Sequence, residues 1–139
     1  MSRERILATA HLRIARPTDN LESISRFYRE GLGFDLLSEF HDHDGFDGIM
    51  LGHAGMAYHL EFTKKAGHLV GLAPTYENLL VFYLPDTNEW NSAIERMMRF
   101  GYEPVISFNP YWNKNGVTFA DSDGYRVVLQ NTEWKTTDS

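Results

Sequence analysis

The chain has no cysteine, which excludes disulfides, thiolate metal ligands and a cysteine nucleophile. It also lacks any apolar run approaching the roughly 20 residues that a membrane-spanning helix needs. The first 17 residues contain no apolar core of signal-peptide length. From these absences we expect a cytoplasmic protein that has no membrane partner.

Three signatures of common chemistries are missing as well. There is no GxSxG nucleophile turn, no phosphate-binding P-loop and no glycine-rich dinucleotide fingerprint, so serine hydrolysis and nucleotide chemistry are not predicted. Positive charge is also scarce, since 13 Lys and Arg face 19 Asp and Glu for a formal net charge of −6. An acidic surface repels phosphate backbones, and we therefore expect no nucleic-acid partner.

What is present is a soluble globular composition over 139 residues, with 42% hydrophobic and 23% charged residues. Alternation of apolar and polar residues predicts strands over 6–16, 34–40, 49–51 and 56–63, with a polar turn over 41–48. Between the first two strands, a helical stripe is predicted, beginning near Asp19 and Glu22 with capping-box spacing. The stripe consists of Leu21, Ile24, Phe27 and Tyr28.

The same order then starts again after a glycine- and proline-containing segment. Strands are predicted over 79–84, 102–107, 116–119 and 125–130, and the last two are joined by a DSDG hairpin turn at 121–124. The helix between the first two of them carries the stripe Trp90, Ile94, Met97 and Met98, all interpreted as core, and ends at Gly101.

Matching landmarks in the two halves indicate an internal repeat. Gly33 and Gly101 are 68 residues apart, as are Gly48 and Gly116, and Asp19 and Asp86 are 67 apart. We therefore predict one domain over 1–139, built of module one (6–63), a linker (64–78), module two (79–131) and a polar tail (132–139). The fold class is α+β, with two paired βαβββ modules forming a curved mixed sheet around a ligand cleft and one helix packed behind each half.

Side chains opposite the helix-facing ones are expected to point into that cleft. Tyr111 and Trp112 lie on a predicted loop at the mouth of the cleft, where aromatic rings suit stacking on a flat ligand. The alternative, favoured for Trp112, is that they pack on the end of the sheet or at a dimer contact. The predicted ligand-binding residues are His11, Arg13, His59, Glu61, Leu79, Val81, Tyr83, Tyr111, Trp112, Arg126 and Val128. The HDHDG stretch with His41 and His43 is interpreted as a solvated loop.

Two stretches resemble a known family. DNLESISRFYREGLGFDLL is similar to the first helix of the vicinal oxygen chelate superfamily, and GVTFADSDGYRVVLQN is similar to its closing hairpin. The segments RPTD, YHLEF, LLVFY and NPYW resemble a bacterial branch of that superfamily, which includes glyoxalase I, bleomycin-resistance proteins and extradiol dioxygenases. The resemblance covers roughly residues 8–131 and implies a cleft built from two modules.

In metal-dependent members of this superfamily, each module supplies one ligand from its first strand and one from its fourth. By resemblance, His11 and Glu61 occupy the two positions of module one and have donor atoms. The corresponding residues of module two are Leu79 and Val128, which cannot bind a metal. A set of His11, His59 and Glu61 is the alternative, as a facial triad of two histidines and one carboxylate.

These observations leave two main functions open, and a closed cleft with no pocket would favour a third, a regulatory or scaffold subunit. The first is a protein that binds a small amphipathic organic molecule without a catalytic metal or other cofactor, as bleomycin-resistance-like members do. The second is an enzyme of the same superfamily, a lyase, isomerase or dioxygenase, that uses His11 or Glu61 as a general base and one divalent ion. In either case we expect a homodimer, in which the modules of the two subunits could be exchanged.

Overall fold

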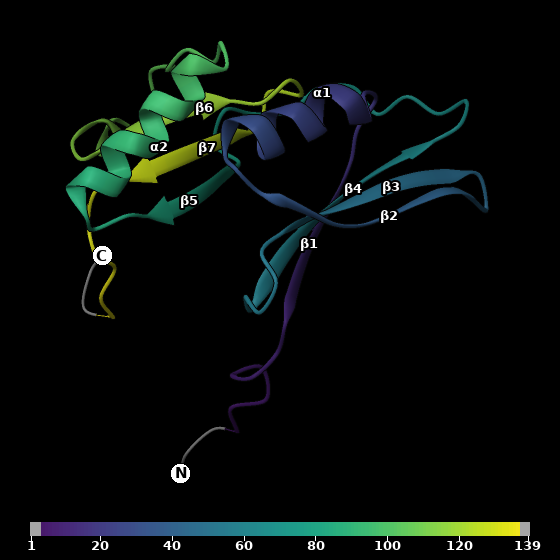
Figure 1. Cartoon of the computed structure of the whole chain (residues 1–139), viewed down its shortest axis with the longest axis horizontal. Helices are drawn as coiled ribbons and strands as arrows, with labels where there is room; N and C mark the ends of the chain where they lie inside the picture. Colours follow the sequence, from purple (N-terminus) through teal and green to yellow (C-terminus); the bar gives the residue numbers. More distant parts are fainter. Residues whose placement is uncertain (1–3, 137–139) are drawn as a thin grey trace. The chain divides into compact units, whose positions relative to one another are not determined.

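The computed structural model describes residues 4–136, which form two α-helices, seven named strands and two short helical turns (Figure 1). In chain order these are β1 (Leu12–Pro17), α1 (Leu21–Arg26), a π-helical turn (Phe27–Gly31), β2 (Asp35–His43), β3 (Phe46–Gly52), β4 (Tyr58–Lys65), β5 (Leu79–Tyr83), α2 (Thr87–Arg99), a 3-10 helix (Pro110–Asn113), β6 (Gly116–Ala120) and β7 (Arg126–Gln130). In this part of the chain, neither helix has the length and apolarity to cross a membrane.

The strands form two sheets with related topologies. In the first, the order is β1-β4-β3-β2, and in the second it is β5-β7-β6. The opening strand of each sheet pairs in parallel with the last strand of its half, and the remaining pairs are antiparallel. The predicted α+β class with two mixed sheets is therefore confirmed, and the second sheet has three strands where four were predicted.

The described residues group into two compact units. The first unit holds the residues up to Leu21 together with Phe34–Val70, and the second holds Glu22–Gly33 together with the residues from Gly71 onwards. Each unit contains one of the two sheets.

The first sheet has one buried and one polar face, as alternation along β4 predicts. Leu60 and Phe62 are 1% and 2% exposed, whereas His59 and Glu61 point to the opposite face. The strand β1 begins later than expected. Residues before it form local turns, with Ala8 N donating to Arg5 O, and these turn hydrogen bonds replace strand pairing.

The prediction of a long polar turn over 41–48 is wrong, because the turn between β2 and β3 is much shorter. Both strands continue almost to its centre, and His43 pairs with Phe46. Only Asp44 and Gly45 remain as the turn, with φ angles of 53° and 85°. An Asp-Gly pair with two positive φ angles matches the right-handed twist of a two-residue hairpin, which explains why the strands extend so far.

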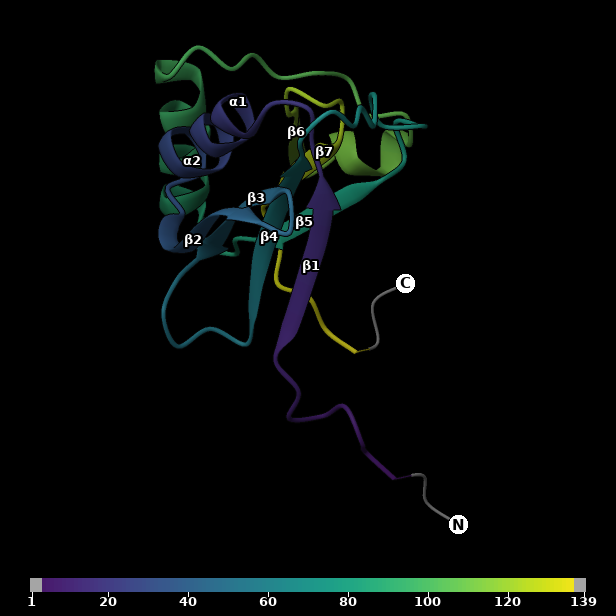
Figure 2. The same cartoon turned by 90° about the vertical axis from the view of Figure 1, so that its right-hand side faces the viewer.

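The first helical segment makes aromatic and hydrogen-bond contacts within the second unit. The Phe27 ring lies 4.9 Å from the Tyr102 ring, and the Tyr28 hydroxyl donates to Asp121 Oδ2 at 2.8 Å. A β-carbon on Gly31 would lie 2.8 Å from Met97 Sδ, so the glycine permits this close approach. Figure 2 shows α1 beside α2.

The second helix has well-defined ends. The Asp86 carboxylate caps its start by accepting from the backbone N–H groups of Asn88 and Glu89, as the spacing predicts. At its end, Gly101 adopts a φ of 92°, and the N–H of Gly101 bonds to Met98 O, which satisfies carbonyls that the helix leaves free.

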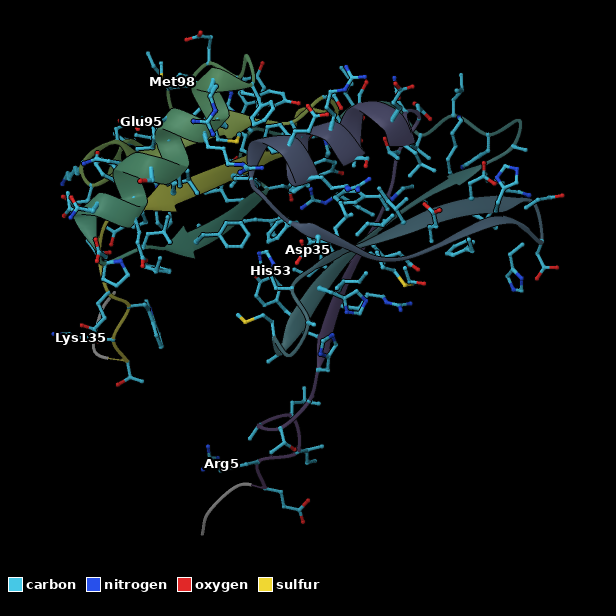
Figure 3. All side chains as sticks on the ribbon, viewed as in Figure 1. Arg5, Asp35, His53, Glu95, Met98 and Lys135 are labelled. Carbon is cyan, nitrogen blue, oxygen red and sulfur yellow. The ribbon has the colours of Figure 1, made fainter. Side chains whose placement is uncertain are left out.

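One member of the predicted helical stripe is not part of the core. Met97 is fully buried, but Met98 is 46% exposed and lies on the outer side of α2 (Figure 3). The reason is that adjacent helical positions are rotated by about 100°, so the two methionines cannot both face the sheet.

The strand predicted over 102–107 is reduced to a single bridge between Val105 and Thr118. Pro104 has no N–H for a sheet ladder. The Ser107 N–H donates to the side chain of Asn113 at 3.2 Å and is likewise unavailable. Neither residue therefore offers a backbone N–H to a neighbouring strand, and the segment does not form a full strand.

Candidate functional site

Four polar side chains of the first unit meet on one face of its sheet. We call His11, Arg13, His59 and Glu61 the module-one cluster. His11 Nε2 lies 2.6 Å from His59 Nδ1, Arg13 Nε donates to His59 Nε2 at 2.9 Å, and Arg13 Nη1 lies 3.4 Å from Glu61 Oε2. Arg13 Nη2 is held only weakly, by Met50 Sδ at 3.7 Å. The cluster forms because β1 and β4 are parallel and place Arg13 directly opposite His59.

The hydrogen bonds define the protonation of both histidines. Since Arg13 Nε is always a donor, His59 Nε2 must be an unprotonated acceptor. The His59 proton is then on Nδ1 and is donated to His11 Nε2. It follows that His11 carries its own proton on Nδ1, which is a further donor at this face.

The environment holds the pKa of His59 below its ordinary value of 6.5. Desolvation is the largest cause, followed by the positive charge of Arg13 and by His11, while Glu61 acts in the opposite direction. Both the geometry and the charges therefore favour a neutral His59.

The module-one cluster does not fit a divalent metal. Within residues 4–136, no group of three or more histidine, aspartate or glutamate side chains lies close enough to hold an ion. For the alternative set of His11, His59 and Glu61, the reason is the Arg13 guanidinium, which bonds to both His59 and Glu61. A cation there would be repelled by Arg13 and would have to displace these bonds.

In the second unit, the predicted inner-face residues lie on one face of the sheet. Leu79 pairs with Arg126, and Val81 pairs with Val128. Exposure differs among them, because Val128 is fully buried and Arg126 is 8% exposed, whereas Tyr83 is 37% exposed. Their contact with a ligand stays a prediction.

Arg126 is held in place by backbone and aromatic contacts. Its Nη1 donates to Ile106 O at 2.9 Å, and its guanidinium carbon lies 4.1 Å from the centre of the Tyr76 ring. Its Nε is buried and has no hydrogen-bond partner among the described residues.

A pocket of about 150 Å³ opens on the second unit. Its lining residues are Tyr76, Glu77, Leu79, Ser107, Phe108, Asn109 and Trp112. Trp112 reaches it from the 3-10 helix, whose start is capped by Asn109 Oδ1 accepting from Tyr111 N at 3.0 Å. Two predicted residues, Leu79 and Trp112, thus meet in one pocket. Tyr111 is 46% exposed and packs edge-on against Trp112 instead of lining the wall.

Sequence reasoning missed several residues of this pocket. Tyr76 falls in the predicted linker, Ser107 is the last residue of the predicted strand over 102–107, and Phe108 directly follows it. The one available signal was the aromatic Phe108 directly before the Asn-Pro pair that starts the 3-10 helix. Met50, which contacts Arg13, gave no signal, because a methionine in a strand is usually core.

The histidines of the HDHDG stretch lie on the β2–β3 hairpin, both with strongly exposed side chains. His41 Nδ1 lies 2.8 Å from Asp47 Oδ1, and Asp42 N donates to the same oxygen at 2.9 Å. These contacts pin the hairpin and belong to no metal-binding group within the described part of the chain.

Comparison with known proteins defines the class of this fold. The structure is similar to Leishmania major glyoxalase I (TM-score 0.67, 18% identity, 88% of this chain and 86% of that one). It is also similar to TnmS3, an antibiotic-binding protein from Streptomyces sp. CB03234 (TM-score 0.61, 21% identity, 87% and 93%). At these identities the likeness shows the fold alone, which is a fold that a glyoxalase I and a glyoxalase/bleomycin-resistance protein share.

Within that class, a much nearer relative is YycE of Bacillus subtilis. The B. subtilis (strain 168) sequence is 44% identical over 124 residues, 89% of each chain. A B. subtilis YycE crystal structure matches with a TM-score of 0.87 and 41% identity over 99% of this chain and 100% of that one. Residues 12–63 match the YycE-like N-terminal domain, and residues 77–131 match the YycE-like C-terminal domain. The chain belongs to the YycE-like family.

Proposed function

We propose that this protein binds a small amphipathic organic molecule and does so without a catalytic metal. The observation that carries the proposal is the module-one cluster, in which Arg13 is locked by His59 and Glu61 yet keeps a side chain that is 46% exposed. A positioned, half-exposed guanidinium is a typical anchor for the polar edge of a ligand. That TnmS3 of the same fold is an antibiotic-binding protein supports a binding role.

The cluster presents donors rather than acceptors. Arg13 Nη2 has only a weak sulfur contact, and the bonding pattern leaves the His11 Nδ1–H as a second donor. Glu61 Oε2 is engaged with Arg13. The ligand edge that matches this arrangement carries acceptors such as carbonyl or carboxylate oxygens, and its apolar part lies over apolar side chains.

The test is a ligand screen by thermal shift on untagged protein, followed by calorimetry of the hits. We expect hits with an acceptor edge to stabilise the wild type, and Arg13→Ala to weaken them by about tenfold or more, as expected for a lost charge-assisted hydrogen bond. The matched control is Arg99→Ala, which removes an exposed arginine from α2. Hits that bind Arg13→Ala as tightly as the wild type would contradict the assignment of Arg13.

The metal-free part of the proposal has its own measurement. Elemental analysis of protein purified without chelators, with and without added Ni²⁺, Zn²⁺, Mn²⁺ and Fe²⁺, should give substoichiometric metal that His11→Ala leaves unchanged. Near one equivalent per chain, abolished by His11→Ala, would overturn it and favour a lyase, isomerase or dioxygenase. We also propose that the protein acts as a cytoplasmic homodimer.

A further inference from the structure

The pocket of the second unit has walls that are largely aromatic. Tyr76, Phe108 and Trp112 line it together with Leu79, and its volume is about 150 Å³. A cavity of this size holds a benzene-sized molecule, and a trimethylammonium group is no larger. The face of an aromatic ring carries negative partial charge and attracts a cation that lies within about 6 Å of the ring centre.

Hydrogen bonds within the chain hold the lining in place. Thr75 Oγ1 accepts from the backbone N–H of Glu77 at 3.1 Å. Asn109 Oδ1 accepts from Tyr111 N at 3.0 Å, and the Tyr111 ring packs edge-on against Trp112 with 4.9 Å between the ring centres. Walls that are already ordered lose less entropy when a ligand binds, which favours affinity.

The charge of the lining favours a positive ligand. Among the described residues that line the pocket, Glu77 is the one that carries a charge. Its carboxylate forms no ion pair within residues 4–136, and the residue is exposed. An ammonium group would be attracted by this carboxylate and by the ring faces together, whereas an anion would be repelled by both.

Arg126 limits this attraction. Its guanidinium carbon lies 4.1 Å from the centre of the Tyr76 ring, so Tyr76 already has one cation against its face, and the charge of Arg126 repels a second. Arg126 is 8% exposed and is not part of the lining. Phe108, Trp112 and Glu77 therefore supply most of the attraction for a cation in the pocket.

We propose that this pocket binds a small organic ammonium ion. The cationic group lies against the rings of Phe108 and Trp112, and the Glu77 carboxylate compensates its charge. This goes beyond the proposed function and does not rest on it. It assigns a second site, in the other unit, whose ligand is a cation, whereas the module-one cluster offers hydrogen-bond donors to acceptor groups.

The experiment uses choline as the probe in a titration of the ¹⁵N-labelled full chain followed by NMR. We expect saturable shifts of backbone amides at 76–79 and 107–112. The carbon isostere of choline, in which a tert-butyl group replaces the trimethylammonium, has the same shape without the charge and should bind about fivefold more weakly. Benzoate, which is flat but negatively charged, should give no saturable shift of these amides.

Two variants test the residues. Glu77→Gln and Phe108→Leu each change an exposed side chain, so the fold should be kept. Each should weaken choline by about threefold or more, the scale of a lost charge pair or a lost ring face at an exposed site. The matched controls are Glu95→Gln on α2 (Figure 3) and Phe46→Leu on β3, both outside the pocket, and they should leave the affinity unchanged.

The proposal is overturned if choline gives no saturable shifts at 76–79 and 107–112, or if its neutral isostere binds equally well. It is also overturned if either Glu77→Gln or Phe108→Leu binds choline as tightly as the wild type. None of these results touches the proposed function, which depends on Arg13-dependent hits in the ligand screen. Conversely, a screen without such hits would leave choline binding at this pocket standing.

Discussion

Arg13 organises the module-one cluster both by its charge and by its hydrogen bonds. Its Nε bond makes His59 Nε2 an acceptor, and its Nη1 neutralises Glu61. Because the arginine side chain cannot lose its proton in a protein, this arrangement persists across the neutral pH range. Protonation of His59 at Nε2 would leave this N–H facing the N–H of Arg13 Nε, so that two donors would face each other.

Titration of His59 by NMR should give a pKa below 6.5, and Arg13→Gln should raise it. Desolvation and then the Arg13 charge lower the pKa of His59 in the folded protein, and the variant removes the second cause. Arg29→Gln, an exposed change outside the cluster, should leave the titration unmoved. A pKa of His59 that is unchanged in Arg13→Gln would refute the coupling.

The lowered pKa of His59 also makes the free energy of unfolding depend on pH. Since the folded pKa is the lower one, the contribution of His59 to the free energy of unfolding is fully present above pH 6.5. It is lost as the pH falls from 6.5 through the folded pKa, because the unfolded chain then binds the proton first. Urea unfolding at a series of pH values should show a smaller acid loss for His59→Gln than for the wild type.

Gly116 permits a close backbone approach in the second unit. A β-carbon there would lie 2.6 Å from Trp112 O and would also contact Gln130 Oε1. We expect Gly116→Ala to lower the free energy of unfolding by about 1–3 kcal/mol, measured by urea unfolding. Adding Gln130→Ala should not restore stability, since the backbone contact remains; full recovery in the double variant would contradict this assignment.

At the scale of elements, α2 depends on the cap at its first turn. Asp86 Oδ1 accepts from Asn88 N at 2.8 Å and from Glu89 N at 3.2 Å. Asp86→Ala should cost about 1 kcal/mol in the free energy of unfolding, and Asp86→Asn should keep most of it, because the amide oxygen still accepts. Equal losses in the two variants, measured by urea unfolding, would show that the carboxylate acts by charge instead.

At the scale of the molecule, several apolar side chains are exposed in the single chain. Leu12 is 56% exposed, Met56 48% and Ile106 83%, and burial of such side chains is what drives association. Light scattering should therefore give twice the 16.0 kDa chain mass, and Leu12→Asp or Ile106→Asp should shift it toward one chain. Asn91→Asp, an exposed change on α2, is the control. A single-chain mass for the wild type at micromolar concentration would disprove the homodimer.

The sequence predicted the features that depend on neighbouring residues. The period of two along β4 separates His59 and Glu61 from Leu60 and Phe62, and it needs no knowledge of the rest of the fold. The same holds for the cap at Asp86. It holds as well for the DSDG turn, where Asp121 Oδ1 accepts from the N–H of Asp123. Such hydrogen bonds close within a few residues, so their spacing is visible in the chain itself.

Contacts between distant residues were decided only by the tertiary structure. The register of β1 against β4 decides which atoms of Arg13 and His59 meet. The pocket of the second unit brings together Tyr76 and Trp112, which are far apart in the sequence. Phe27 and Tyr28 contact Tyr102 and Asp121, although the apolar stripe to which they belong would fit any apolar surface. Alternation tells which side of a strand a residue faces, but the partner across that face is selected by packing of the whole chain.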